Sequence, residues 1–377
     1  MNQLTSKLRT LPAMLATAAL LGSALVANVP GVVSAAGTSC PISISESGST
    51  TVYPALVQAK SGFEAANGGC TLNLAATGSG AGITDVLNGT TDIAASSRPL
   101  KAGTESTNLY AWKVGGDAMV IAVRNSAAMS GVTSITSAQV ASIYSGTLTS
   151  WSSLGGSGTI VPRSRIIGSG SRDDLLRLFG ITDVNEQATI AATGLARFQT
   201  STQEATDACN NDNQVVYTSL ANLQTYGPGG QNCLKALTLD GVAPSVQSVQ
   251  QGTYPAPRTL FLVLRKSEIA AASATDSSVT KAMDLVNYML SSAGQNAVGA
   301  VGFVQTAVPS AKPVVDYDVN LDGAVGLADI GAITGKWGQT STCPGWIRAD
   351  VTNDGAIGIA DIGAITGKWG GVGFVAP

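Results

Sequence analysis

Four short turns rich in glycine, serine and threonine contain most of the side chains in this sequence that could bind a ligand. The clearest lies in "RIIGSGSRDDLLRLF" (165–179), where Gly168 and Gly170 allow backbone angles that let successive amides converge on one point. An amphipathic run follows, so a helix is predicted to begin near Ser171 and to present unpaired N–H groups. This is the chemistry of a small-anion site, and further hydroxyl and guanidinium donors would come from Ser169, Ser171, Arg165 and Arg172.

A second interpretation of residues 165–179 is a turn that merely begins a helix, with both arginines in solvent. The segment 165–179 is not a nucleotide-binding loop, because the GxxxxGK[ST] spacing and its lysine are absent. Three further turns, at 48–51, 77–82 and 96–98, also follow predicted strands. Ligands of open α/β sheets bind beyond the carboxyl ends of the strands, where all these turns would lie. The set therefore favours an anion site over ordinary loops.

The elements that position these turns alternate between strand and helix. "PISISESGS", "CTLNLAATG" and "TDIAASS" predict strands separated by helical segments, which indicates a parallel sheet with helices on both faces. "GGDAMVIAVR", "QVVYTSLA" and "RTLFLVLR" predict further strands, and residues 279–298 predict one amphipathic helix. The fold class is thus α/β.

Composition limits the possible functions. The 377 residues include no histidine, which excludes His-based acid–base and nucleophilic catalysis and disfavours most zinc and iron sites. The formal net charge of −3 argues against nucleic acid as a partner. Only 12% of the residues are charged and 44 are glycine, which is typical of a secreted protein.

Residues 1–36 resemble an export signal, with Lys7 and Arg9 before an apolar run and a small-residue cleavage site ending at Ala35. A membrane anchor is the alternative. Five cysteines in an exported chain predict two disulfides and one unpaired residue, Cys343. Cys40 and Cys70 each precede a predicted strand, so parallel neighbours would bring them together, and Cys209 and Cys233 flank a short segment.

The ordered set "SGSTTVYP", "GSGAGI", "DIAASSRPL", "VASIYSGTLTSW", "RIIGSGSR" and "YPAPRTLFLVL" resembles the phosphate-binding protein of phosphate ABC transporters, the PstS type, over 42–303. The resemblance implies a two-lobed, type 2 Venus-flytrap fold within residues 37–308. One lobe would comprise about 38–115 and 255–308, and the other about 116–254. It also implies a phosphate ligand, no enzymatic activity, delivery to a transporter permease and a monomer.

The resemblance places the phosphate ligands on the four turns. It implies Ser49, Thr50 and Thr51 in the first turn and Ser79 and Gly80 in the second, followed by Ser97, Arg98, Arg165, Ser169, Gly170 and Ser171. Two positions depart from the family pattern, because Ser97 and Ile167 stand where some members have an aspartate that accepts a proton from phosphate. Asp92 is nearby, but we expect it to stabilise a strand end. Selectivity for phosphate over sulfate is therefore not explained by an identified acceptor.

The C-terminal region contains a duplicated, twelve-residue acidic loop, repeated at an offset of 32 residues. Oxygen ligands at loop positions 1, 3, 5 and 12, with glycine at 6 and a carbonyl at 7, predict two EF-hand-like calcium sites. The first comprises Asp318, Asn320, Asp322, Ala324 and Asp329, and the second Asp350, Thr352, Asp354, Ala356 and Asp361. A metal-free repeat of acidic turns is the alternative, and Thr352 predicts weaker binding in the second loop.

Each loop is followed by one helix face, formed by Ile330, Ile333 and Trp337 and repeated as Ile362, Ile365 and Trp369. Residues 316–371 thus resemble a type I dockerin domain, joined by a linker at 309–315, and the resemblance implies a cohesin partner. Its recognition pairs fall on Leu327–Ala328 and Ile359–Ala360. The sequence predicts an extracellular phosphate-capturing protein attached through this module. A phosphate-ester hydrolase, or an adhesive protein with a vestigial anion cleft, are the alternatives.

Overall fold

The structure, a computed structural model, describes residues 42–68, 70–271, 277–306, 317–320, 324–339, 349–352 and 356–370. The predicted export signal and the linker lie outside these residues. Within the described part, no helix is long and apolar enough to cross a membrane. The described residues before 307 form two lobes, and those from 317 onward form a small C-terminal module.

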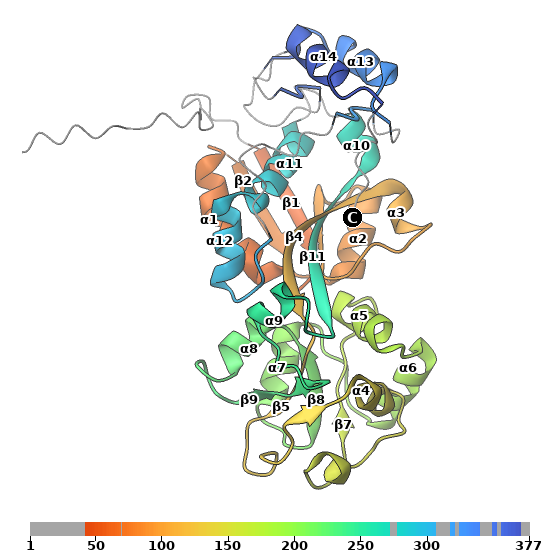
Figure 1. The fold of residues 1–377 in the computed structure, drawn as a ribbon, viewed down its shortest axis with the longest axis vertical. Helices are drawn as coiled ribbons and strands as arrows, with labels where there is room; N and C mark the ends of the chain where they lie inside the picture. Colours follow the sequence, from red (N-terminus) through yellow and green to blue (C-terminus); the bar gives the residue numbers. More distant parts are fainter. Residues whose placement is uncertain are drawn as a thin grey trace, which may run out of the picture. The chain divides into compact units, whose positions relative to one another are not determined.

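Lobe 1 is built on a five-stranded sheet with the order β2-β1-β3-β11-β4 (Figure 1). β1 pairs in parallel with β2 and with β3, as the sequence predicts. β11, however, is antiparallel to both β3 and β4, so the sheet is mixed. The reason is that β4 leads the chain into lobe 2 and β11 brings it back beside β4. The strands are β1 (Ile42–Gly48), β2 (Cys70–Ala75), β3 (Ile93–Ser96), β4 (Leu109–Ala118) and β11 (Pro257–Arg265).

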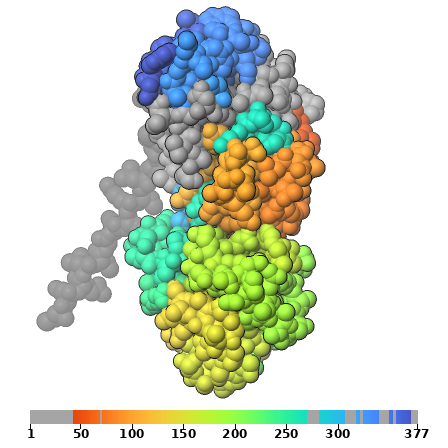
Figure 2. Space-filling view, turned by 90° about the vertical axis from the view of Figure 1, so that its right-hand side faces the viewer, coloured from red at the N-terminus to blue at the C-terminus, as the bar shows by residue number. Residues whose placement is uncertain are grey.

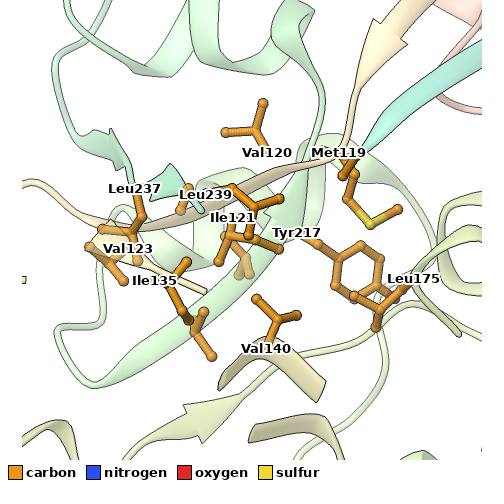
Figure 3. Close-up of a cluster of buried hydrophobic side chains, with 14 of the residues drawn as sticks. Met119, Val120, Ile121, Val123, Ile135, Val140, Leu175, Tyr217, Leu237 and Leu239 are labelled. Atoms are coloured by element: carbon orange, nitrogen blue, oxygen red, sulfur yellow. The ribbon is translucent and has the colours of Figure 1, made fainter. Parts of the chain in front are cut away.

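Lobe 2 contains a four-stranded sheet with the order β7-β8-β5-β9 and the two-stranded pair β10-β6. Its strands are β5 (Val120–Arg124), β6 (Ser134–Ile135), β7 (Val161–Pro162), β8 (Gln214–Thr218), β9 (Leu234–Ala236) and β10 (Thr238–Leu239). Its helices are α4 (Ser137–Tyr144), η1 (Trp151–Leu154), α5 (Gly170–Phe179), α6 (Asp183–Ala192), α7 (Ser201–Ala208), α8 (Leu220–Tyr226) and α9 (Val246–Gln250). The apolar core between these elements includes Met119, Ile121, Val140, Leu175 and Tyr217 (Figure 3).

Helices cover both faces of the lobe 1 sheet, as the strand–helix alternation predicts. α1, α11 and α12 pack on one face and α2 on the other, and a separate apolar cluster fills each side. The helices are α1 (Tyr53–Ala66), α2 (Ser79–Asn88), α3 (Glu105–Asn108), α10 (Lys266–Ala271), α11 (Ser277–Leu290) and α12 (Ser292–Ala300).

Residues 279–298, predicted as one helix, form two. Ser291 breaks the run, because its hydroxyl accepts a hydrogen bond from the Gly294 amide (3.3 Å) and so begins α12. Gly294 permits the bend, since a Cβ there would lie 2.1 Å from the carbonyl oxygen of Tyr288.

The two predicted disulfides have different outcomes. Cys209 and Cys233 are bonded, which confirms that pair. The predicted Cys40–Cys70 bond is wrong, because Cys70 is a free, buried thiol in the part of the chain described here. The β1–β2 register places Ile42 opposite Cys70, so the two predicted strand starts are offset by two residues. Cys40 and Cys343 lie outside the described residues.

The C-terminal module has its own apolar cluster, formed around Val319, Val325, Ile333, Ile357 and Ile365. Its helices are α13 (Leu327–Thr334) and α14 (Ile359–Thr366). The prediction that Trp337 and Trp369 belong to the paired helix faces is wrong: both lie beyond the helix ends, with 53% and 56% of their surface exposed. Ile333 and Ile365 do pack in the cluster.

Candidate functional site

Three strand ends of lobe 1 meet at one edge of the sheet. The Ser49 amide donates to the Ala95 carbonyl (2.9 Å), and the Gly78 amide donates to the Gly48 carbonyl (2.7 Å). Gly48 has φ +151°, and a Cβ there would lie 2.2 Å from the Ala95 carbonyl oxygen. Only glycine therefore allows the first turn to lie this close to the end of β3.

The first predicted turn is buried. Ser49, Thr50 and Thr51 are at most 8% exposed. The Ser49 hydroxyl accepts hydrogen bonds from the amides of Thr51 (3.2 Å) and Val52 (3.3 Å), which holds the turn against the start of α1. The hydroxyls of Thr50 and Thr51 instead contact lobe 2.

The second and third turns touch each other through serine hydroxyls. The oxygens of Ser79 and Ser97 are 3.3 Å apart, and the Ser97 amide donates to the Ser79 hydroxyl (3.2 Å). Asp92, near the start of β3, accepts hydrogen bonds from the amide and the hydroxyl of Ser45 (2.7 and 2.8 Å). Asp92 thus has the structural role expected for it.

Lobe 2 contributes the fourth turn and the start of α5. Gly168 has φ +90°, and Ser169 immediately precedes the helix, which begins at Gly170. Residues 169–171 are buried. The Gly80 amide of lobe 1 donates to the Gly168 carbonyl (2.9 Å), and the hydroxyls of Thr51 and Ser171 are 3.1 Å apart. The residues that the sequence placed on four separate turns therefore lie together where the lobes meet. Figure 2 shows the orange surface of lobe 1 directly against the green surface of lobe 2.

Arg165 is the cationic side chain of this cluster. It is 1% exposed, and its Nη2 donates to the Thr50 hydroxyl (2.9 Å) and to the Gln199 carbonyl (2.7 Å). Its Nε donates to the Phe198 carbonyl (3.3 Å). Its buried Nη1 has no hydrogen-bond partner among the residues that the structure describes. Burial lowers the pKa of this guanidinium, so a bound anion would find a poorly solvated positive charge.

Arg98 and Arg172, the two other arginines considered as anion ligands, form ion pairs with carboxylates of the protein. Arg98 makes a two-pronged ion pair with Glu105 (2.7 and 2.9 Å), and its Nε lies 2.9 Å from Asp173 at the start of α5. It thus connects lobe 1 to lobe 2, and we assign it to this contact rather than to a ligand. Arg172 pairs with Glu186 and Asp183 on α6.

A family profile described as "PBP superfamily domain" matches residues 34–293 of the chain. The chain belongs to the PBP superfamily. Two solved structures share the fold of this PBP domain. One, from Clostridium perfringens, is described as a phosphate ABC transporter substrate-binding protein with bound phosphate; it is 24% identical, covers 70% of this chain and 100% of its own, and has a TM-score of 0.61. The other, an ABC-type phosphate transport receptor from Vibrio cholerae, is 21% identical with the same coverage and a TM-score of 0.55. No curated protein matches the chain.

Sequence analysis missed three buried charged residues beside the site of the PBP domain. Arg258 on β11 stands directly opposite Asp117 on β4, and the two form an ion pair (2.5 Å). Glu204 on α7 is fully buried, and burial raises its pKa to about 8 against the opposing effect of Arg165. The sequence did contain a signal for Arg258 and Asp117, because each is a lone charged residue beside an otherwise apolar strand segment.

An open cavity of about 580 Å³ lies on lobe 2 behind Arg165. Phe198 and Gln199 contribute to its lining, and their carbonyls are the ones that hold Arg165. The Arg163 side chain stacks over the Phe198 ring, 4.3 Å from its centroid.

Replacing Gly170 by alanine is expected to weaken ligand binding at least ~10-fold, with little change in the melting temperature. A Cβ at Gly170 would lie 2.3 Å from the Ser79 hydroxyl oxygen and 2.8 Å from the Ser79 Cβ, which no side-chain rotation can relieve. The clash is between lobes, so the separated lobes stay intact. Titration calorimetry with phosphate measures the loss, and Gly68→Ala, which meets nothing within 4 Å, is the control. Unchanged affinity would show that the lobes need not approach this closely.

Proposed function

We propose that the PBP domain captures inorganic phosphate and supplies it to the permease of an ABC transporter. The observation that carries this proposal is the convergence of Arg165, the hydroxyls of Thr50, Thr51 and Ser171, and the start of α5. Hydroxyls, a helix N-terminus and a buried guanidinium are the donors that bind a tetrahedral oxyanion. The two solved phosphate transport proteins with this fold support the choice of phosphate.

Phosphate is expected to raise the melting temperature of the PBP domain in a concentration-dependent way. A ligand that binds only the folded state stabilises it by about 2.7 kcal/mol at a hundredfold excess over Kd. Differential scanning calorimetry measures the shift, and titration calorimetry should give one site per chain. A melting temperature that stays constant up to millimolar phosphate would contradict the proposed function.

The C-terminal module is proposed to bind two calcium ions. Its two loops have the same arrangement: Asp329 accepts hydrogen bonds from the amides of Asn320 (3.2 Å) and Gly326 (2.7 Å), and Asp361 from those of Thr352 (3.0 Å) and Gly358 (2.8 Å). The carboxylates at positions 1 and 12 of both loops are buried. Oxygen ligands in tight loops fit Ca²⁺, which prefers carboxylate and carbonyl oxygens. Asp322 and Asp354, at position 5, lie outside the described residues.

We further propose that this module attaches the protein to a cohesin-bearing partner. Leu327 and Ile359, the first residues of α13 and α14, are each 73% exposed. Exposed large apolar side chains at equivalent positions of two repeats fit a protein partner rather than solvent. Export with cleavage near Ala35, an extracellular location and a monomeric state complete the proposal.

A further inference from the structure

Arg258 lies between the anion-site turns and the two strands, β4 and β11, that join the lobes. It is 3% exposed and lies near the start of β11, directly opposite Asp117 in the antiparallel pair with β4. Its Nη2 donates to the Asp117 carboxylate (2.5 Å) and to the Thr218 carbonyl (3.3 Å). The other Asp117 oxygen accepts from the Leu220 amide (2.9 Å). One side of the guanidinium is thus fixed to both lobes.

The other side of this guanidinium faces the anion site. Its Nη1 donates to the Ser171 hydroxyl (2.9 Å), whose oxygen is also 3.1 Å from that of Thr51. Its Nε–H lies on the same edge as Nη2, the edge that holds Asp117, and is buried without a hydrogen-bond partner in the described part of the chain. Nη1 is therefore the atom that brings a buried cationic donor to the hydroxyls of Thr51 and Ser171, where an anion could accept a charge-assisted hydrogen bond.

An unpaired donor does lie in the cluster on the other arginine. Arg165 Nη1 is buried and without a partner among the described residues, and because buried polar groups are nearly always paired it indicates a ligand. The positive charge of Arg258 contributes to lowering the pKa of Arg165, so the two cations are close enough to repel each other. Asp117 pairs with Arg258, and burial raises the pKa values of two further acids near the arginines, Asp174 and Glu204.

We infer that Arg258 is a second cationic ligand of the oxyanion site, and that the site selects a tetrahedral dianion by its charge. The inference rests on the proposed function, because it concerns the same site. Arg165 Nη1, which is unpaired in the described residues, and Arg258 Nη1, which faces the Ser171 hydroxyl, provide charge-assisted hydrogen bonds to two oxygens of one ligand. A dianion between them also removes their mutual repulsion.

The test separates a ligand role for Arg258 from simple neutralisation of Asp117. Arg258→Gln combined with Asp117→Asn removes both charges of the ion pair, and titration calorimetry with phosphate measures binding. We expect an affinity at least ~10-fold below that of the unmodified protein. The matched control is Arg124→Gln with Asp212→Asn, which removes a partly exposed ion pair (3.2 Å) of lobe 2 and should leave binding unchanged. Wild-type affinity in the Arg258–Asp117 variant would overturn the inference.

A milder variant covers the case in which that double variant does not fold. Arg258→Lys keeps the charge beside Asp117 but removes the guanidinium fork. It should keep the ion pair with Asp117, remain folded and lose at least ~5-fold in phosphate affinity. Full affinity with an unchanged melting temperature would overturn the ligand role.

Charge selection is tested with two anions of the same shape. Sulfate, a tetrahedral dianion, should compete with phosphate for the unmodified protein, whereas perchlorate, a tetrahedral monoanion, should compete at least ~10-fold more weakly. Equal competition by both anions would overturn selection by charge. Absence of phosphate binding by the unmodified protein would overturn the proposed function itself, and the inference with it.

Discussion

Replacing Arg165 by alanine is expected to lower the phosphate affinity of the PBP domain by roughly 10- to 150-fold. A hydrogen bond from a charged donor contributes about 1.5–3 kcal/mol, against about 0.5–1.5 kcal/mol for a neutral pair. Ser79→Ala, which removes one neutral hydroxyl of the same cluster, should therefore cost only about 2- to 10-fold. Titration calorimetry on both variants measures the difference.

Two comparisons show whether the loss arises in the site. Arg124→Ala removes an arginine of lobe 2 whose side chain is 37% exposed, and should leave affinity unchanged. Arg165→Lys keeps a positive charge but loses the guanidinium that donates to the Phe198 and Gln199 carbonyls. Its phosphate affinity should therefore lie between those of the wild type and Arg165→Ala. Equal losses for Arg165→Ala and Ser79→Ala would mean that the guanidinium does not contact the anion.

The convergence of the three lobe 1 turns was predictable from the sequence, because parallel strands carry their carboxyl ends to one edge of a sheet. β1, β2 and β3 are parallel, and the Ser49–Ala95 hydrogen bond joins the turn after β1 to the end of β3. The contact of these turns with residues 165–171 of lobe 2 followed from the family resemblance. Periodicity alone carries no information about which segments of two lobes meet.

Long-range charge partners could not be predicted in the same way. The resemblance implies Arg98 as a ligand, but it pairs with Glu105 and with Asp173, which comes from the other lobe. Asp117 and Arg258 are 141 residues apart, and only the antiparallel β4–β11 register makes them neighbours. The Cys40–Cys70 prediction depended on register in the same way, because β1 and β2 are parallel neighbours but Cys70 lies opposite Ile42. Register depends on packing of whole strands, which local sequence patterns do not specify.

Removal of calcium is expected to unfold the C-terminal module while the PBP domain stays folded. The module has a small apolar cluster of its own, and a domain of this size rarely folds without a staple. Asp318, Asp329 and Asp361 are fully buried and Asp350 is 6% exposed. Buried carboxylates destabilise a fold unless hydrogen bonds and cations compensate their charge. Circular dichroism of a 313–377 fragment should show helix gained with Ca²⁺ and lost with a chelator.

Substitutions within the first loop distinguish metal-dependent folding from a structural turn. Asp318→Ala with Asp329→Ala removes the ligands at positions 1 and 12, and should abolish most of the calcium-induced helix. Leu327→Ala is the matched control, because this side chain is 73% exposed and should leave the calcium response intact. Thr352 supplies a neutral hydroxyl where the first loop has Asn320, so the second site should fill at higher calcium. A fragment that is equally helical in chelator and in calcium would contradict the calcium proposal. It would show that hydrogen bonds from the backbone amides are enough to stabilise the buried carboxylates.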